Sequence, residues 1–354
     1  MKKLLTTALL ALSLCFTQAV QAKVTHLLPK PQVIELTNGN AFALGRTVTI
    51  TDPTDCTLLR EFFTDNGCTI AVGGVPVTVT LVTSIEGAYD YELYGYENES
   101  YSLEITADAI NIKAVTKTGV IRAVQTLSQL AEGYDGTPQL ESLTMTDWPA
   151  FKLRGYMHDV GRSFITTEEL IKQIKLFSRF KINTFHWHLT ENQAWRFEVK
   201  AYPQLTSNAS MTRFAGQYYT QEDCKAVMAA AKKYGIVVIP EIDMPGHSEA
   251  FKRAMGYDMQ STDGKKALKK VLDEVVGNRV VKNTANAVFV IVHRNKNISV
   301  PFLTENFCSV KSIFVLDTIY NLRGTNTVCI VSIGIAIKAL KLASLFPSQS
   351  VTEI

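Results

Sequence analysis

The stretch that decides the fold reads His186-Trp187-His188-Leu189-Thr190-Glu191-Asn192-Gln193-Ala194-Trp195-Arg196. An apolar run from Ile182 to Phe185 leads into it and has the character of a buried strand. Parallel α/β folds place their chemistry where such strands end, so polar side chains at this point indicate a functional site. The alternative is an ordinary polar loop. Two tryptophans within nine residues count against it, because large aromatic rings are seldom left in a solvated loop.

Two further segments repeat the pattern of an apolar strand that ends in polar residues, and helices are predicted between the strands. Repetition at the same end of successive strands favours a closed (β/α)₈ barrel over an open sheet with one switch point. The expected strands are Leu153–Val160, Ile182–Leu189 and Ile236–Pro240, and the expected helices start at Thr166, run over Thr220–Lys233 and run over about Asp263–Val275.

The chain before Trp148-Pro149 predicts a small α+β domain over residues 23–147. Alternating stretches indicate strands, and apolar spacing after Gly119 indicates a helix with one apolar face. Residues 148–276 would then be the first part of the barrel domain, and residues 277–354 a tail without matching motifs. The strands are expected near 47–50, 77–82, 100–105 and 110–114, and the helices near 57–65 and 119–130.

The composition is that of an ordinary globular protein, with 46% hydrophobic and 19% charged residues and a net charge of +3. No basic block predicts nucleic-acid binding, and no Gly-rich phosphate loop is present. Lys2 and Lys3, an apolar run and small residues up to Ala22 predict a signal peptide over residues 1–22, too short for a membrane span. We therefore expect export to the periplasm, the cell surface or the medium. Lipidation at Cys15 is an alternative, but Leu14 stands where a small residue is needed.

The cysteines leave two possibilities open. Cys56 and Cys68 flank the predicted helix 57–65 and could form a disulfide in an oxidising compartment. Cys224, Cys308 and Cys329 are isolated, so buried free thiols are expected there. No pair has the spacing of zinc ligands, and neither a metal nor a cofactor is predicted.

Several of these motifs together resemble family 20 glycoside hydrolases, the bacterial β-N-acetylhexosaminidases. The resemblance covers residues 24–275. The matching stretches are Leu153-Arg154-Gly155, Asp159-Val160-Gly161-Arg162, His186 to Arg196, Pro240-Glu241-Ile242-Asp243-Met244-Pro245-Gly246-His247-Ser248, and Gln125 to Leu130 after Gly119-Val120.

The resemblance implies removal of terminal N-acetylhexosamine residues from glycans by substrate-assisted, retaining hydrolysis. In that family the substrate's acetamide attacks the anomeric carbon, an Asp orients the acetamide, and an adjacent Glu protonates the leaving oxygen. Arg154 matches a residue that binds the 3- and 4-hydroxyls of the sugar. Glu191 and His247 match a pair that sits behind the catalytic Glu and tunes its proton affinity. Asn192 departs from the family, which often has a second Asp there.

Each of these residues also has a structural interpretation. Arg154 could form an ion pair beneath the barrel mouth, and His247 could be a core histidine with its hydrogen bonds satisfied. For Asp159 and Arg162 a structural salt bridge is favoured over substrate contact.

The catalytic Asp-Glu pair expected after the third helix is missing from the sequence. No Asp-Glu or Glu-Asp dipeptide follows Asp273-Glu274, which we interpret as a solvated helix face. Only 206 residues follow Trp148, whereas a (β/α)₈ barrel needs about 250. We therefore expect an incomplete barrel, truncated or frameshifted after about residue 276. Two functions remain open: a β-N-acetylhexosaminidase, or an inactive fragment with residual sugar binding.

Overall fold

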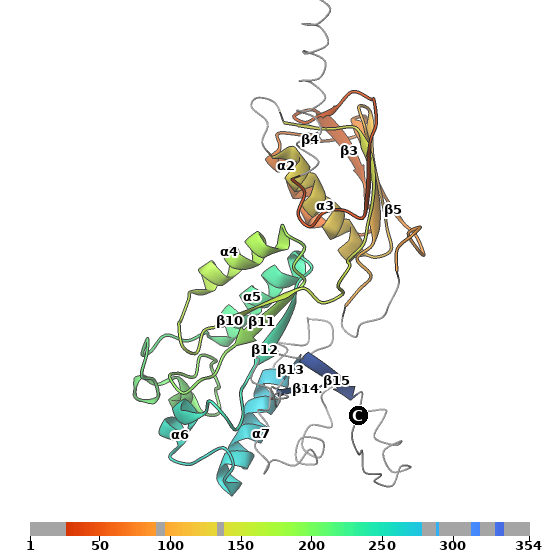
Figure 1. The fold of residues 1–354 in the computed structure, drawn as a ribbon. Coiled ribbons are helices and arrows are strands. Elements are labelled where there is room, and N and C mark those ends of the chain that lie inside the picture. The colour runs from red at the N-terminus through yellow and green to blue at the C-terminus, as the bar shows by residue number, and fades with distance from the viewer. Residues whose placement is uncertain are drawn as a thin grey trace, which may run out of the picture. The chain divides into compact units, whose positions relative to one another are not determined.

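The computed structural model describes residues 26–89, 96–132 and 138–277 and three short strands beyond them. The chain divides into two compact units (Figure 1). Unit 1 comprises residues 1–154 with 175–183 and 233–235, and unit 2 comprises 155–174, 184–232 and 236–354. No described helix is both long and apolar enough to cross a membrane. The predicted signal peptide lies outside the described residues.

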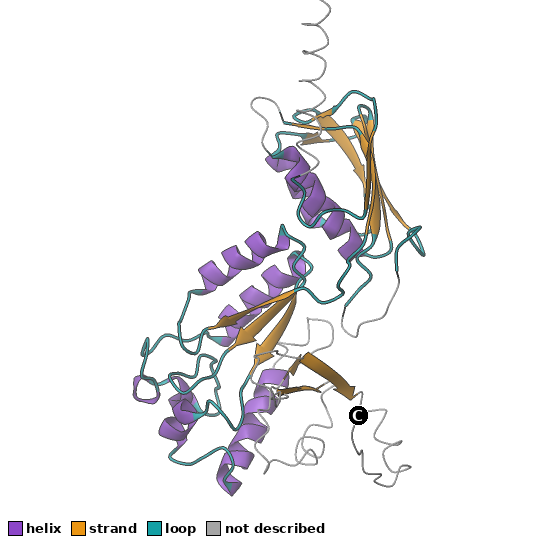
Figure 2. Ribbon diagram, viewed as in Figure 1, coloured by secondary structure: helices purple, strands orange, loops and turns teal. Residues whose placement is uncertain are grey.

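In its described part, unit 1 is built on a seven-stranded mixed sheet that packs with helices (Figure 2). The sheet order is β1-β9-β6-β7-β5-β3-β4, and β2 pairs separately with β8. The four predicted strands are confirmed as β3, β5, β6 and β7. The strands are β1 (Val33–Leu36), β2 (Phe42–Ala43), β3 (Thr47–Thr51), β4 (Thr69–Ile70), β5 (Val75–Leu81), β6 (Tyr101–Thr106), β7 (Ala109–Ala114), β8 (Gln139–Leu140) and β9 (Leu143–Asp147).

Two of the described helices pack in unit 1, α2 (Thr57–Asp65) and α3 (Lys117–Ala131), and both were predicted. The Thr116 side chain caps α3 by accepting hydrogen bonds from the amides of Thr118 and Gly119. Both helices bury apolar side chains in one core with the sheet, including Phe63, Leu103 and Leu127. Unit 1 therefore has a hydrophobic core of its own.

Cys56 and Cys68 are both buried free thiols, not a disulfide, and the Cys68 sulfur accepts a hydrogen bond from the amide of Gly45 at 3.3 Å. Cys224 in unit 2 is a buried free thiol as expected. The predictions for Cys15, Cys308 and Cys329 concern residues outside those described.

Unit 2 contains three parallel strands in the order β10-β11-β12 with helices between them. All three predicted strands and helices are present, each with somewhat different ends. The register pairs Asp159 with His188 and His188 with Glu241, so the three strands end level with one another. The elements are β10 (Gly155–Asp159), α4 (Thr167–Ser178), β11 (Thr184–His188), α5 (Gln221–Lys233), β12 (Val237–Glu241), α6 (Glu249–Met255) and α7 (Thr262–Gly277), with 3₁₀ turns η1 (Pro203–Thr206) and η2 (Asn208–Ser210).

The helix starts follow from capping residues in the sequence. The Thr166 hydroxyl accepts from the amide of Glu169 at 3.2 Å at the start of α4. At the start of α5 the bonds are reciprocal: the Thr220 hydroxyl accepts from the amide of Asp223, and the Asp223 carboxylate accepts from the amide of Thr220. These caps fix where the chain turns back after β10 and β11.

Three short strands follow α7 in the described part of the chain. β13 (Val288–Phe289) pairs in parallel with β14 (Ile313–Thr318), which pairs antiparallel with β15 (Ile330–Ile335). Among the described residues, β13 is hydrogen-bonded to β14 and not to β12. The rest of the predicted tail after residue 277 lies outside the described residues.

Candidate active site

The loop after β11 buries the large side chains of the stretch from His186 to Arg196. Trp187 and Trp195 are each 1% exposed, so the solvated-loop alternative is wrong. The Arg196 side chain is fully buried and donates to the carbonyls of Val160, Phe214 and Gln217 at 2.7–2.9 Å. Burial lowers the pKa of Arg196 to about 10, but these carbonyls still satisfy its donors. The loop is therefore a fixed platform for the residues beside it.

Glu191 and His247 meet across the ends of β11 and β12. The Glu191 carboxylate is 1% exposed and lies 2.5 Å from Nδ1 of His247, which confirms the expected proximity of the two side chains. His247 has a φ of +48°, in the left-handed region that only a few non-glycine residues occupy. The loop after β12 thus turns sharply to bring the imidazole over Glu191.

Asp159 and Arg162 form the salt bridge that the sequence favoured, but Arg162 does more. Its guanidinium pairs with the Asp159 carboxylate and also with Glu191. It lies 3.4 Å from Nδ1 of His247 as well. Arg162 is therefore a second partner of Glu191 beside His247, and it holds the carboxylate in place from the β10 side.

Beneath this pair, two histidines of β11 converge on one carboxylate of β12. Nε2 of His186 lies 2.6 Å and Nδ1 of His188 lies 2.7 Å from the same oxygen of Glu241. Burial alone would raise the pKa of Glu241, but the contacts with His186 and His188 outweigh it and lower this pKa to about 2. Burial alone would lower the pKa of His188, and Glu241 reverses this and raises it. Glu241 and His188 thus favour their charged forms.

Asp243, two residues after Glu241, is fully buried beside these groups. Its amide donates to the Thr190 hydroxyl at 2.9 Å, which ties the loop after β12 to the end of β11. Burial raises the pKa of Asp243 to about 7, and the Glu241 carboxylate adds to the shift while His247 opposes it. The site therefore holds a carboxyl group that changes charge near neutral pH.

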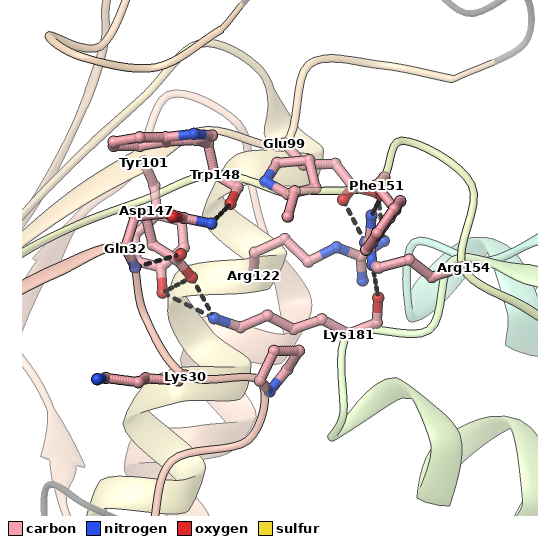
Figure 3. A pocket seen from close by; sticks show the side chains of 13 residues that line it. Lys30, Gln32, Glu99, Tyr101, Arg122, Asp147, Trp148, Phe151, Arg154 and Lys181 are labelled. Carbon is pink, nitrogen blue, oxygen red and sulfur yellow. Dashed lines mark hydrogen bonds and ion pairs between the residues drawn. The ribbon is translucent and has the colours of Figure 1, made fainter.

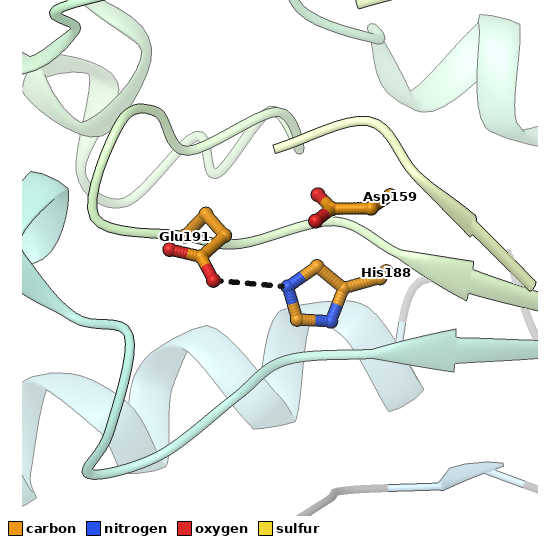
Figure 4. A group of neighbouring side chains, drawn as sticks. All are labelled: Asp159, His188 and Glu191. Atoms are coloured by element: carbon orange, nitrogen blue, oxygen red, sulfur yellow. Dashed lines mark ion pairs between the residues drawn. The ribbon is translucent and has the colours of Figure 1, made fainter. Parts of the chain in front are cut away.

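Two overlapping groups bring possible metal ligands within 4.8 Å of one another: Asp159 with His188 and Glu191, and His188 with Glu241 and Asp243. Figure 4 shows the first group, in which Nε2 of His188 is 3.9 Å from the Glu191 carboxylate. Ligands of a tetrahedral zinc ion lie about 3.3 Å apart, given bonds of about 2.0–2.1 Å. The contacts of Glu241 with the two histidines are shorter than that. They describe an ion-pair network and give no reason to invoke a metal.

Arg154 belongs to unit 1, whereas Glu191 and His247 belong to unit 2. It directly precedes β10 and therefore stands at the opposite end of that strand from Asp159. Its guanidinium pairs with the buried Glu99 and donates to the carbonyls of Lys181 and Phe151, each at 2.8 Å. The structural interpretation of Arg154 as an ion-pair residue is thus correct, and its sugar contact stays a prediction.

The interpretation of Asp273-Glu274 as a solvated helix face is wrong for Glu274. Asp273 is exposed and pairs with Lys269, as expected. Glu274 instead accepts hydrogen bonds from the amides of Lys200 and Ala201 at 2.6 and 3.1 Å. It therefore fastens α7 to the segment after β11. The amides that it satisfies lie in a distant loop, which the local sequence of α7 does not reveal.

Sequence reasoning assigned no role to His186, His188, Glu241 or Asp243. A signal was present: both pairs have i, i+2 spacing at strand ends, and alternate residues of a strand face the same side. The spacing alone does not reveal the register between β11 and β12, which pairs His188 with Glu241.

The family comparisons match both parts of the chain. The sequence model of glycosyl hydrolase family 20, domain 2, matches residues 24–148. The model of the catalytic domain of the same family matches residues 151–310 and so continues beyond residue 276. A beta-hexosaminidase of Vibrio furnissii is 33% identical over 259 residues, 67% of this chain and 40% of that protein. A beta-hexosaminidase of Porphyromonas gingivalis is 41% identical over 167 residues, 44% of this chain and 21% of that protein.

Solved structures agree with this assignment. The β-N-acetylhexosaminidase of Bacteroides fragilis superposes with a TM-score of 0.63 at 26% identity, over 79% of this chain and 59% of that one. The Vibrio harveyi family 20 exo-β-N-acetylglucosaminidase, solved with N-acetylglucosamine, gives 0.62 at 24% identity over 80% and 48% of the chains, which supports the fold alone. This chain spans less than half the length of the Vibrio furnissii and Porphyromonas gingivalis enzymes. The fold is a small α+β domain followed by part of a (β/α)₈ barrel, and the chain belongs to glycosyl hydrolase family 20.

Proposed function

We propose that this chain carries the supporting half of a β-N-acetylhexosaminidase active site. The reaction is removal of terminal N-acetylhexosamine residues from glycans by substrate-assisted, retaining hydrolysis. The observation that carries the proposal is the 2.5 Å contact between Glu191 and His247 where β11 and β12 end. This is the end of parallel strands at which barrel enzymes hold their reacting groups.

In this proposal His247 is a positioning residue for a catalytic acid. Glu191 is buried and is held by Arg162, so its carboxylate can orient the His247 ring. An oriented imidazole behind a carboxylic acid adjusts how readily that acid gives up its proton to the leaving oxygen. The His247 side chain is 34% exposed, so a group of the substrate side can reach it.

The same reaction needs a carboxylate at the acetamide and an acid at the glycosidic oxygen. Residues 277–354 contain no adjacent Asp and Glu, and their acidic residues are Glu305, Asp317 and Glu353. This observation favours the second candidate function for the chain as it stands: sugar binding without turnover. We expect hydrolysis to depend on a fourth strand that supplies the acid pair.

A chimera tests this proposal. Residues 277–354 are replaced by the part of the Bacteroides fragilis enzyme that starts at its own fourth barrel strand, and release of p-nitrophenol from p-nitrophenyl N-acetyl-β-D-glucosaminide is measured. We expect turnover by the chimera, and a loss of roughly 10²-fold in kcat when Glu191→Gln or His247→Asn is added. The control Glu168→Gln alters an exposed ion pair with Lys172 on α4 and should leave kcat unchanged. A folded chimera whose kcat ignores Glu191→Gln would refute the role of the pair.

The sugar contact that the resemblance implies for Arg154 is not part of this proposal, because Arg154 directly precedes β10 whereas the Glu191–His247 pair lies where β11 and β12 end. Its guanidinium pairs instead with Glu99. In the chimera, Arg154→Lys should lower thermal stability and leave KM unchanged. A raised KM with unchanged thermal stability would show that the guanidinium binds the sugar after all.

We further propose that the protein is exported and acts on glycans outside the cytoplasm. The support is the sequence of residues 1–22, with two lysines, an apolar run and small residues before Ala22. The test is N-terminal sequencing of the protein from fractionated cells. A mature chain that begins at Lys23 is expected, and a chain in the cytoplasm that keeps residues 1–22 would contradict export.

A further inference from the structure

Unit 1 contains a cavity of about 270 Å³ that the proposed hydrolase function does not use (Figure 3). It lies beside α3, between the end of β9 and the loop that contains Lys181. Pockets for drug-sized ligands measure roughly 300–1,000 Å³, so this one suits a smaller molecule. Its lining combines buried charged side chains with aromatic rings, which is the composition of a site that binds a ligand with two different ends.

One part of the polar wall is balanced within the protein. The Lys181 ammonium donates to the Asp147 carboxylate at 2.6 Å and to the Tyr101 hydroxyl at 3.0 Å. Lys181 is 7% exposed and Asp147 is 6% exposed, so this is a buried pair with one charge of each sign. It accounts for the charge at that side of the cavity and leaves no need for a ligand there.

The other part of the polar wall has more positive than negative charge. Glu99 is the single carboxylate shared by Arg122, at 2.9 Å, and Arg154. Arg122 is 1% exposed, and its guanidinium also donates to Gln125 and to the carbonyls of Tyr234 and Gly235. The lining as a whole has four cationic side chains, Lys30, Arg122, Arg154 and Lys181, and two carboxylates, Glu99 and Asp147. An anion in the cavity would offset part of this excess of positive charge.

The mouth of the cavity has a different character. Figure 3 shows Lys30 on the side opposite Trp148 and Phe151, with the cavity between them. Lys30 is exposed, and the Phe151 ring is 76% exposed although it is large and apolar. Flat rings at a cavity mouth pack well against an aromatic or aliphatic body. A ligand that fits both the positively charged inner wall and the rings at the mouth would have an anionic group at one end and a flat or apolar body at the other.

We propose that this cavity binds a small organic carboxylate with a flat or apolar body. The carboxylate would be attracted by the charges of Arg122, Arg154 and Lys30, and the body would pack against Trp148 and Phe151. Coulomb attraction of this kind favours a carboxylate over a neutral group of the same shape. The cavity lies wholly in unit 1, so the test of this proposal does not depend on the role of the Glu191–His247 pair in unit 2.

Benzoate and benzamide provide a matched pair of probes for the full-length chain. They have the same size and shape and differ in charge. Isothermal titration and ligand-observed NMR should detect benzoate binding that weakens with added salt, and no comparable binding of benzamide. Equal binding of the two would overturn the proposal, because apolar contact alone would then explain it. Failure of benzoate to bind would overturn it as well.

Variants locate the binding. Lys30→Gln should weaken benzoate binding about fivefold, as expected for an exposed charge, and Trp148→Leu should weaken it through loss of ring contact. The control Lys113→Gln removes an exposed charge from β7 outside the cavity and should have no effect. Both test positions are partly or fully exposed, so both variants should fold, which circular dichroism checks.

If Lys30→Gln and Trp148→Leu leave benzoate binding unchanged, the ligand binds elsewhere and the proposal is contradicted. If N-acetylglucosamine binds instead of benzoate, and Trp148→Leu abolishes that binding, the cavity is a sugar pocket and the carboxylate proposal is overturned.

Discussion

The Glu191 carboxylate and Nδ1 of His247 lie 2.5 Å apart, on loops that follow neighbouring parallel strands. The β11–β12 register brings the two strand ends level, and the left-handed backbone of His247 turns its ring toward Glu191. Arg162 closes the arrangement from β10. Three successive strand ends therefore contribute to one buried carboxylate, and the proposed role of the pair depends on this arrangement.

Glu191→Gln should lower the free energy of unfolding by about 1–3 kcal/mol, because it leaves the charged Arg162 beside a neutral amide. Arg162 and His247 are partly exposed, so water compensates for some of the loss. Urea denaturation followed by tryptophan fluorescence measures the change. Glu168→Gln, which alters an exposed pair with Lys172, should change stability by less than about 1 kcal/mol. Equal effects of the two substitutions would show that Glu191 is not the anchored group described above.

Gly161→Ala should displace the Glu191 side chain while residue 191 itself remains a glutamate. A Cβ at position 161 would lie 2.6 Å from Cβ of Glu191, closer than real side chains approach one another. We expect a loss of about 1–3 kcal/mol, typical of overpacking, and a separation of Glu191 from His247 in a crystal structure of the variant. Gly155→Ala meets Thr184 at 3.2 Å and should cost less. A variant structure with the Glu191–His247 contact unchanged would contradict this explanation of Gly161.

Asp243→Asn should change how stability depends on pH. The pKa of Asp243 is raised from 3.8 to about 7, so between these values the folded state binds more protons than the unfolded state. Its contribution to stability is therefore present at low pH and is lost as pH rises through about 7. The asparagine of the variant does not titrate, so the variant does not lose this stability. The free energy of unfolding of the variant relative to the parent should therefore increase from pH 5 to pH 8. Glu241, with a pKa of about 2, does not titrate in this range. Thermal unfolding at the two pH values measures the difference, and a parallel shift of both proteins would contradict it.

Arg154→Ala should destabilise the protein, because it removes one of two guanidinium partners from the buried carboxylate of Glu99. We expect a loss of about 1–3 kcal/mol in urea denaturation, since a charged buried group loses a hydrogen bond. The control Arg60→Ala breaks an exposed pair with Asp55 at 3.7 Å and should cost little. Unchanged stability in Arg154→Ala would show that the ion pair is dispensable.

Much of the fold could be predicted from local sequence. The alternating strands β5 to β7 and the capping residues Thr166 and Thr220 act within a few residues of one another, so their pattern is readable. The mixed order of the unit 1 sheet could not be predicted, because it depends on pairing between distant strands such as β1 with β9. The short strands β2, β4 and β8 contain only two residues each and leave no periodic signal.

The site was predicted to the extent that motifs identify it. Glu191 and His247 came from the family resemblance, and the structure brings them together. The second role of Arg162 and the convergence of two histidines on Glu241 depend on strand register and loop path, which a single sequence does not encode locally. The prediction for Glu274 was wrong for a similar reason, because its partners Lys200 and Ala201 lie in another part of the chain.

The most direct test of the supporting-half proposal is the release of p-nitrophenol from p-nitrophenyl N-acetyl-β-D-glucosaminide by the purified full-length chain, measured beside the chimera. Without the acid pair the chain forgoes general acid catalysis, typically worth 10²–10⁴-fold, and the electrostatic stabilisation that the acetamide carboxylate provides. We predict background release by the chain and turnover by the chimera. Turnover by the chain that survives repurification and disappears in Glu191→Gln would contradict the account, because an acid such as Glu305 or Asp317 would then have to complete the site.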